Sequence, residues 1–358
     1  MRPVVGEHVT VAGTAMMFAD VLLQIQADGP LITAIAAVAL VAMVLLVVGL
    51  AITVVGVVVP AAMMSGAGAA VASSANIGFA DQTFGGFAAA TPTAPKPESK
   101  LWFAYGSWWA DMASTATGGY TIERLDRSTN SWVDTGVALD PRGNTAADVL
   151  WNGAHLFVAS HVVSSSSSTA QSNNPARLYR YSWSGSSWTL DSAFPVTITT
   201  YSAEALTIAQ DGTGRIWSTF TRYRRLYLTS TSGSADSPAV SFVTPTIPTL
   251  SNLSAADSTA ATTLTSDDIS AVVSNGGATT VVWGNQNNGT YYAARRSDAG
   301  GGWQASVVVR GSLMSDDHIN IKADPSDPYG RVFVALKTSR NDAVPAVKTD
   351  PLLLVAEY

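Results

Sequence analysis

Residues 148–159 read DVLWNGAHLFVA, in which an acidic residue precedes an apolar strand, an Asn-Gly turn and a second apolar strand. The same order recurs in EALTIAQDGTGRIW (204–217), DISAVVSNGGATTVVW (268–283) and DHINIKADPSDPYGRVFVA (317–335). The acidic residues that open the four copies lie 56, 64 and 49 residues apart. A repeat of this length, with several short strands per copy, is typical of a β-propeller. We therefore predict an all-β fold built from four-stranded blades.

The propeller is predicted to occupy residues 101–358, where apolar and polar side chains alternate with the period of a half-buried strand. Residues 101–136 supply three strands of a first blade whose innermost strand is missing. The later blades are expected at 147–195, 203–245, 267–310 and from Asp317 onward. That makes four to five blades, and we expect the chain to be a C-terminally truncated piece of a propeller with six or seven.

Three tryptophans, Trp132, Trp188 and Trp303, each follow a polar turn between the third and fourth expected strands of a blade. An indole ring in that position can cover the sheet of the neighbouring blade, which stabilises the fold by about 2–3 kcal/mol. We predict that these rings pack between blades.

Two short motifs resemble known repeat families. Residues 118–132 contain Gly-Gly-Tyr, then Leu-Asp and Trp, and this pattern resembles one kelch repeat. Residues 297–303 read SDAGGGW, which is similar to the Asp-box of sialidase-type (BNR) repeats but one residue shorter between its Ser and Asp. The resemblance implies a propeller of four-stranded blades. Both families include enzymes and binding modules, so it implies no particular activity.

The N-terminal part differs in composition from the rest. Residues 31–59 contain no charged side chain, and about 20 apolar residues suffice to cross a bilayer as a helix. We predict a transmembrane helix or signal anchor at 30–60, preceded by a segment 1–29 that reflects a misplaced start and followed by an Ala/Gly/Ser/Pro-rich linker at 61–100. The alternative is a cleaved signal peptide, because residues 70–72 read Ala-Val-Ala. The propeller is thus expected outside the cytoplasm, anchored to a membrane or secreted.

Charge and cysteine content narrow the function classes. From residue 96 onward the chain carries 19 basic and 22 acidic residues, whereas a nucleic-acid-binding domain needs a basic face. We expect no nucleic-acid partner. The chain has no cysteine, which excludes disulfides, thiolate metal sites and cysteine nucleophiles.

The acidic residues that open the repeats, Asp148, Glu204, Asp268 and Asp317, are the main candidate site. Equivalent positions before the innermost strands are expected to form a ring at the mouth of the central channel. Such a ring could bind a polar ligand or Ca²⁺, which takes oxygen ligands, and His318 would add a titratable group. The alternative is that each carboxylate accepts main-chain N–H bonds between blades.

Two further candidates are Trp108 and Trp109, expected in a loop of the first blade, where paired rings could stack on a sugar; the alternative is a place in the core. No Ser-His-Asp, P-loop, Rossmann or zinc-protease signature is present, and the Arg motif of true sialidases is missing. We predict a membrane-tethered propeller that binds a carbohydrate or protein, with a glycan-acting hydrolase or lyase of sialidase-like architecture as the alternative. Whether it is an enzyme stays open.

Overall fold

The computed structural model describes residues 96–114, 116–327, 329–342 and 351–358. The predicted membrane helix at 30–60, the segment 1–29 and most of the predicted linker lie outside these residues. Within them, the helices are too short and too polar to span a bilayer. The last residues of the predicted linker pack against the sheets, and Glu98 keeps only 7% of its surface exposed.

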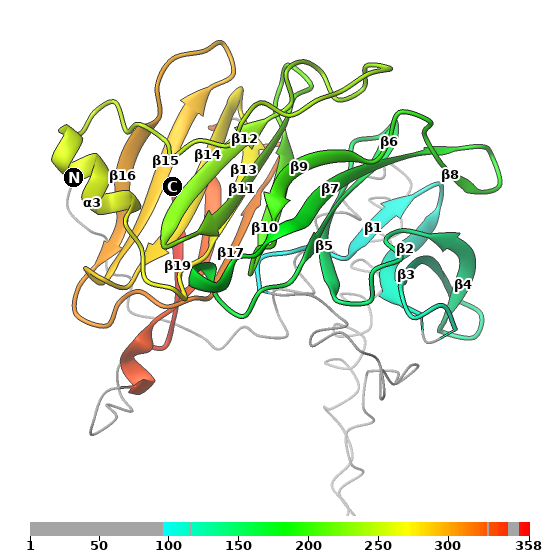
Figure 1. Cartoon of the computed structure of the whole chain (residues 1–358), viewed down its shortest axis with the longest axis horizontal. Coiled ribbons are helices and arrows are strands. Elements are labelled where there is room, and N and C mark those ends of the chain that lie inside the picture. Colours follow the sequence, from blue (N-terminus) through cyan, green and yellow to red (C-terminus); the bar gives the residue numbers. More distant parts are fainter. Residues whose placement is uncertain (1–95, 115, 328, 343–350) are drawn as a thin grey trace, which may run out of the picture. The chain divides into compact units, whose positions relative to one another are not determined.

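The described residues fold into five antiparallel sheets that follow one another along the chain (Figure 1). The first sheet contains β1 (Leu101–Ala104), β2 (Ser107–Ala113), β3 (Tyr120–Asp126) and β4 (Ser131–Ala138). The second contains β5 (Thr145–Trp151), β6 (His155–Val162), β7 (Ser172–Trp183), β8 (Trp188–Leu190) and β9 (Val196–Tyr201), with both β8 and β9 paired to β7.

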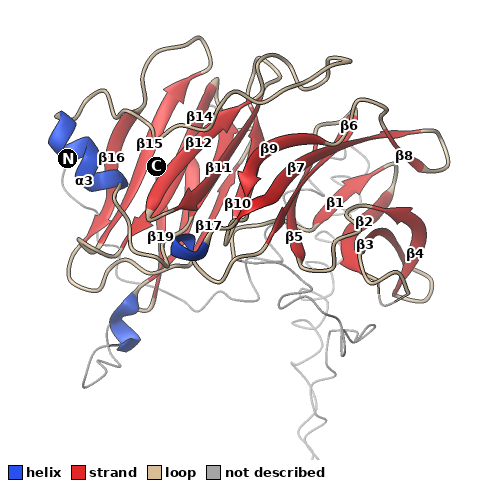
Figure 2. Ribbon diagram, in the orientation of Figure 1, coloured by secondary structure: helices blue, strands red, loops and turns tan. Residues whose placement is uncertain are grey.

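The three later sheets repeat this plan with three, four and three strands. The third contains β10 (Leu206–Gln210), β11 (Ile216–Arg222) and β12 (Arg225–Ser230); the fourth contains β13 (Ser270–Asn275), β14 (Ala278–Asn285), β15 (Thr290–Ser297) and β16 (Gln304–Arg310). The fifth contains β17 (Ile319–Ala323), β18 (Val332–Lys337) and β19 (Leu353–Glu357). In the third sheet, single bridges from Leu228 to Thr246 and from Thr231 to Phe242 stand beyond β12. Strands dominate the described chain (Figure 2).

Successive sheets are arranged like propeller blades. Their first strands β1, β5, β10, β13 and β17 lie next to one another in that order. Four hydrophobic cores fill the spaces between the first and second, second and third, third and fourth, and fourth and fifth sheets. Each sheet therefore buries its faces against its neighbours in the sequence, which is how repeat architectures obtain a continuous core. The prediction of an all-β chain of antiparallel sheets is confirmed, while a parent ring of six or seven blades stays a prediction.

Two of the three tryptophans that follow polar turns, Trp188 and Trp303, pack between sheets. Trp188 is 2% exposed, and its ring lies edge-on to Trp102 of the first sheet with centroids 6.0 Å apart. Trp303 meets Trp217 of the third sheet in the same way, with centroids 5.3 Å apart. The predicted role of these two rings is confirmed.

The first sheet has four strands, where the sequence predicted three. The extra hairpin is β1–β2, which turns at Tyr105 (φ 52°) and Gly106 (φ 74°). Two successive left-handed residues match the twist of a tight hairpin. Tyr-Gly carries a weaker turn signal than Asn-Gly, and the sequence therefore placed Trp108 and Trp109 in a loop instead of a second strand.

Helices are few in the described chain. The helix α3 (Ala255–Thr262) begins at Ser254, whose hydroxyl accepts the N–H of Asp257 at 3.1 Å and so satisfies a free donor of the first turn. Its last turn covers the fourth sheet, because the indole of Trp283 donates to the carbonyl of Ala261 at 2.9 Å. Two 3₁₀ turns complete the set, η1 (Ser167–Thr169) and η2 (Ser339–Asp342).

Candidate functional site

Three carboxylates from three sheets meet just before the first strands of those sheets. Glu204 precedes β10, Asp267 precedes β13 and Asp317 precedes β17, and one oxygen of each lies within 4.8 Å of the others. They meet because β10, β13 and β17 are neighbours, so the chain enters these strands at one place. We call Glu204, Asp267 and Asp317 the acidic cluster.

Lys96 reaches the acidic cluster from the segment that leads into the first sheet. Its ammonium lies 3.8 Å from the carboxylate of Glu204 and forms a short ion pair with that of Asp317. Glu204 and Asp317 keep 12% and 13% of their side-chain surface exposed, so the pairing is largely shielded from water. The Lys96 ammonium thus pairs with two of the three carboxylates of the acidic cluster.

Glu204 has the altered acidity expected of a proton donor. Burial raises the pKa of its carboxyl group to about 7, Lys96 lowers it, and the negative charges of Asp267 and Asp268 raise it further. Its Oε2 is buried without a hydrogen-bond partner within the described part of the chain. Near neutral pH this carboxyl group therefore holds its proton in a substantial fraction of molecules.

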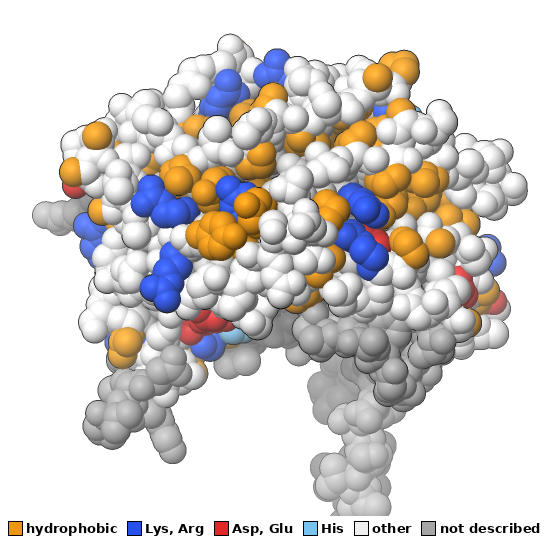
Figure 3. All heavy atoms as spheres, in the orientation of Figure 1, with side chains coloured by type: hydrophobic (Ala, Val, Ile, Leu, Met, Phe, Trp, Pro, Cys, Tyr) orange, Lys and Arg blue, Asp and Glu red, His pale blue; other side chains and the backbone are white. Residues whose placement is uncertain are grey.

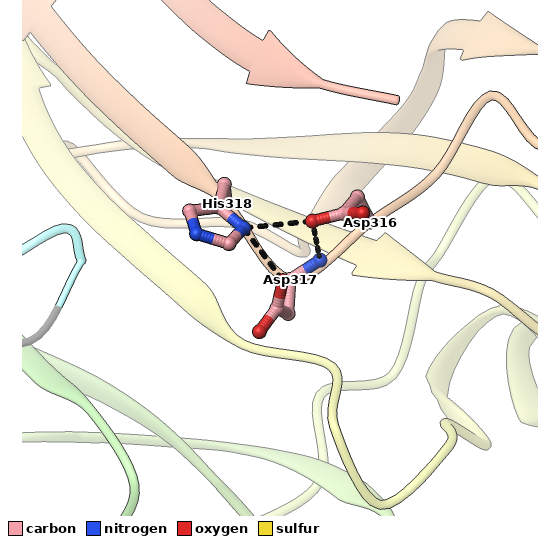
Figure 4. A group of neighbouring side chains, drawn as sticks. All are labelled: Asp316, Asp317 and His318. Carbon is pink, nitrogen blue, oxygen red and sulfur yellow. Dashed lines mark hydrogen bonds and ion pairs between the residues drawn. The ribbon is translucent and has the colours of Figure 1, made fainter. Parts of the chain in front are cut away.

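His318 contacts both Asp317 of the acidic cluster and the neighbouring carboxylate of Asp316 (Figure 4). Its Nδ1 lies 2.7 Å from Asp316 and 2.6 Å from Asp317. Asp316 also accepts hydrogen bonds from Lys337 at 2.6 Å and Ser339 at 2.9 Å. Although burial acts to raise the pKa of Asp316, these hydrogen bonds outweigh it and hold the pKa below its usual value. Asp316 is therefore an ionised anchor for His318.

Among the described residues, two sets of side chains bring their donor atoms close enough to hold a cation: the acidic cluster, and Asp316, Asp317 and His318. Asp316 is already bound by Lys337, which leaves the acidic cluster as the freer set. All its ligand atoms are oxygens, the type that Ca²⁺ takes. The ammonium of Lys96, however, already supplies a positive charge beside these carboxylates. A calcium role stays a prediction.

Asp148 lies inside a strand and away from the acidic cluster. The sequence placed it ahead of the strand, whereas β5 begins three residues earlier, at Thr145. Its Oδ1 accepts the N–H of Ser99 at 2.6 Å and its Oδ2 accepts that of Ile208 at 2.8 Å. Burial raises its pKa to about 7. Asp148 therefore joins β5 to the first strand of the next sheet.

Asp268 also accepts hydrogen bonds from the main chain. Its neighbour Asp267, rather than Asp268, joins the acidic cluster. Asp268 is fully buried and accepts the N–H of Thr265 at 2.6 Å and that of Gln286 at 3.1 Å. These main-chain bonds hold Asp268 in place, and it is the carboxylate of Asp267 that joins the acidic cluster. Of the four predicted residues, the structure thus brings together Glu204 and Asp317.

A cavity of about 420 Å³ runs along the first strands β5, β10, β13 and β17. Asp148 and Lys322 are its charged lining residues. The remainder of the lining is mostly small or aliphatic side chains, together with Pro97 and Ser99 from the segment before β1. The central channel predicted from the sequence stays a prediction; the structure shows a cavity lined by these first strands.

Trp108 and Trp109 lie in β2, where the sequence predicted a loop. Their rings point to opposite faces because side chains alternate along a strand. Trp109 is 4% exposed and its indole donates to the carbonyl of Ala104 at 2.9 Å. Trp108 is half-buried against Phe103, with ring centroids 5.4 Å apart. The two rings therefore do not form a paired platform.

Lys96 and Asp267 are the members of this site that sequence reasoning missed. The doublets Asp267-Asp268 and Asp316-Asp317 were a usable signal, since in each pair one side chain faces the acidic cluster and the other holds local structure. Lys96 carried no such signal, because it lay in a stretch with the composition of a linker.

Comparisons with known proteins supply structural likenesses but no family. No family model and no curated protein matches the chain. A xylan β-1,4-xylosidase from Bacillus halodurans C-125 is 12% identical over 69% of this chain, with a TM-score of 0.38, and the match spans 50% of the xylosidase. An α-L-arabinanase from Penicillium chrysogenum is 11% identical over 75% of this chain and 94% of its own, with a TM-score of 0.32.

The NanB sialidase from Streptococcus pneumoniae is 10% identical over 74% of this chain and 50% of its own, with a TM-score of 0.29. At TM-scores below 0.5, these likenesses do not establish a function. The kelch-like and BNR-like resemblances are not supported by a family match.

Proposed function

We propose that the acidic cluster cleaves glycosidic bonds, with Glu204 as the acid. The observation that carries this proposal is a carboxyl group with a pKa of about 7 next to two other carboxylates. Glycoside hydrolysis needs two carboxyl groups, one protonated and the other ionised. Their surroundings must therefore give them different pKa values.

Asp267 is the carboxylate best placed to act with Glu204. It is exposed, and within the described residues its carboxylate carries neither a hydrogen bond nor an ion pair. One oxygen of Asp267 lies within 4.8 Å of one oxygen of Glu204, a close approach that favours the retaining arrangement, in which the two carboxyl groups are about 5–5.5 Å apart, over the inverting one. We therefore assign Asp267 as the nucleophile.

The reaction has two steps. In the first, an oxygen of Asp267 bonds to the anomeric carbon while the bond to the leaving oxygen breaks and Glu204 gives that oxygen its proton. In the second, Glu204 takes a proton from water, and the resulting hydroxide displaces Asp267 from the sugar. Atoms and charge balance as hydrolysis of one glycosidic bond.

Lys96, Asp317 and His318 position and tune this pair. Lys96 lowers the pKa of Glu204, against the larger effect of burial, and its ion pair with Asp317 holds the ammonium beside the acid. His318 in turn fixes Asp317 from the other side. The net result keeps Glu204 poised near neutral pH, where a proton donor is most effective.

Turnover by the full-length chain on a panel of aryl pentosides, aryl hexosides, an aryl sialoside and soluble polysaccharides tests the proposal. We expect at least one substrate to be cleaved and Glu204→Gln to lower its kcat about 10²–10⁴-fold, the usual contribution of general acid catalysis. Glu357→Gln, the same change at an exposed residue of β19, serves as the control and should leave kcat unchanged. Absence of turnover on the whole panel, or equal turnover by Glu204→Gln, would refute it.

We further propose that the protein acts outside the cytoplasm, tethered to a membrane by residues 31–59, with secretion after cleavage as the alternative. The support is the uncharged run at 31–59 and the Pro-rich stretch at 91–97. Fractionation of cells that express the chain with and without residues 1–64 tests the tether. Recovery of both forms in the soluble fraction would contradict it.

A further inference from the structure

A second recess lies between the first two sheets, distinct from the acidic cluster on the third, fourth and fifth. It has a volume of about 540 Å³ and is bordered by the β1–β2 turn, by β3 and β4, and by the β7–β8 turn. We call it the aromatic cleft. Its volume falls within the roughly 300–1,000 Å³ of small-molecule sites.

Four aromatic rings, those of Tyr105, Trp109, Trp183 and Trp188, line the aromatic cleft. Tyr105 is 53% exposed and stacks on Trp183 with centroids 5.0 Å apart and planes 17° from parallel. Trp183 in turn meets Trp109 and Trp188 edge-on, at 5.3 and 5.2 Å. Because each ring is braced by another, Tyr105 presents an ordered apolar surface before any ligand arrives.

Several polar groups on the walls of the aromatic cleft are free to bind. The exposed guanidinium of Arg124 and the hydroxyls of Ser107 and Ser186 make no hydrogen bond within the described residues. The indole N–H of Trp188, which is 2% exposed, is buried and has no acceptor there either. A buried indole N–H usually has a partner, and this unpaired donor belongs to a residue that lines the aromatic cleft.

We propose that the aromatic cleft binds a segment of a neutral saccharide. Its apolar rings match the C–H face of a pyranose or furanose, and its free hydroxyls and guanidinium match the sugar's hydroxyl groups, which both donate and accept. Arg124 and Asp134 bring opposite charges to the lining, so an ionic ligand gains no net attraction. The site goes beyond the proposed hydrolysis and stands independently of it, since the two share no residue.

Aromatic-lined grooves also take proline-rich peptides. The Ser107 and Ser186 hydroxyls can both donate and accept hydrogen bonds. The hydroxyl groups of a sugar can do the same, whereas a peptide in the polyproline conformation offers carbonyl acceptors but few donors. These two side chains therefore favour the sugar. A peptide with the sequence of residues 91–97 of this chain is therefore the competing probe.

Tyr105 and Tyr223 provide a matched pair of variants. Both are exposed tyrosines, 53% and 51%, and both lie in left-handed hairpin turns with φ of 52° and 48°. Asn tolerates that conformation, so Tyr105→Asn removes the ring with little strain and Tyr223→Asn is its control. Tyr223 belongs to the turn between β11 and β12 and does not line the aromatic cleft.

Isothermal titration calorimetry of the full-length chain with xylohexaose, cellohexaose and mannohexaose tests the proposal. We expect millimolar or tighter binding of at least one, weakened about tenfold or more by Tyr105→Asn and unchanged by Tyr223→Asn. Binding should persist in Glu204→Gln protein, which separates this site from the proposed catalysis. The proposal is overturned if none of the three sugars binds, if Tyr105→Asn binds as tightly as wild type, or if only the 91–97 peptide binds.

Discussion

Asp148 and Glu204 are both acidic side chains at the inner strands, and both have a pKa raised to about 7, chiefly by burial. Their partners differ. Asp148 lies within β5 and uses both oxygens to accept main-chain N–H groups of Ser99 and Ile208. Glu204 lies ahead of β10, faces Lys96 and two other carboxylates, and keeps one oxygen unpaired within the described chain.

This contrast shows that a raised pKa does not by itself mark a reactive group. Both oxygens of the Asp148 carboxylate already accept a main-chain N–H, so a ligand would have to compete with bonds that link the strands. The Glu204 carboxyl group instead faces side chains and keeps 12% of its surface exposed, so no strand-linking bond depends on it. The nature of the partners, rather than the size of the pKa shift, separates the structural group from the chemical one.

Removal of the structural carboxylate should give the largest effect on stability. Asp148→Ala leaves two largely buried N–H groups without an acceptor, and we expect the free energy of unfolding to fall by about 2–4 kcal/mol. Glu204→Ala removes an acid that burial disfavours, so we expect a change below about 1 kcal/mol. Urea unfolding at pH 7 measures both. Equal losses in the two variants would contradict this distinction between Asp148 and Glu204.

The effect of pH on stability should be smaller than the effect of Asp148→Ala, and its sign can be predicted. Because the folded pKa values of Asp148 and Glu204 lie above their unfolded values, the folded state binds more protons between about pH 4 and 7. The free energy of unfolding should therefore fall as pH rises through this window. In Glu204→Gln we expect the fall from pH 5 to 8 to shrink by about 1–3 kcal/mol.

Urea unfolding at several pH values measures this dependence. Glu357→Gln, at an exposed position, is the control and should keep the wild-type slope. A wild-type protein that gains stability from pH 5 to 8, or a Glu204→Gln protein with the wild-type slope, would contradict the assignment of a raised pKa to Glu204.

Much of the fold could be predicted from the repeat, because the Asn-Gly and Asp-Gly turns between apolar runs mark hairpins at regular intervals. The β1–β2 hairpin was missed because it turns at Tyr105-Gly106, where the left-handed backbone at a tyrosine has no strong local signal. The packing of Trp188 and Trp303 followed from their place after polar turns.

The candidate site could be predicted only in part. Glu204 and Asp317 followed from their position ahead of an apolar strand, but the register of Asp148 depended on where β5 begins, and Thr145-Ala146-Ala147 gives no clear boundary. The choice between Asp267 and Asp268 depends on backbone direction. Lys96 reaches Glu204 from more than 100 residues away, a contact that only the packed sheets create.

The most direct test of the central claim is the pH–rate profile of glycoside cleavage by wild-type and Lys96→Met protein. Wild-type kcat should fall above an apparent pKa near 7, where Glu204 loses its proton. Since Lys96 lowers the pKa of Glu204, its removal should move this alkaline limb to higher pH by up to about one unit. An alkaline limb that is absent, or that stays in place in Lys96→Met, would contradict the role of Glu204 as the acid.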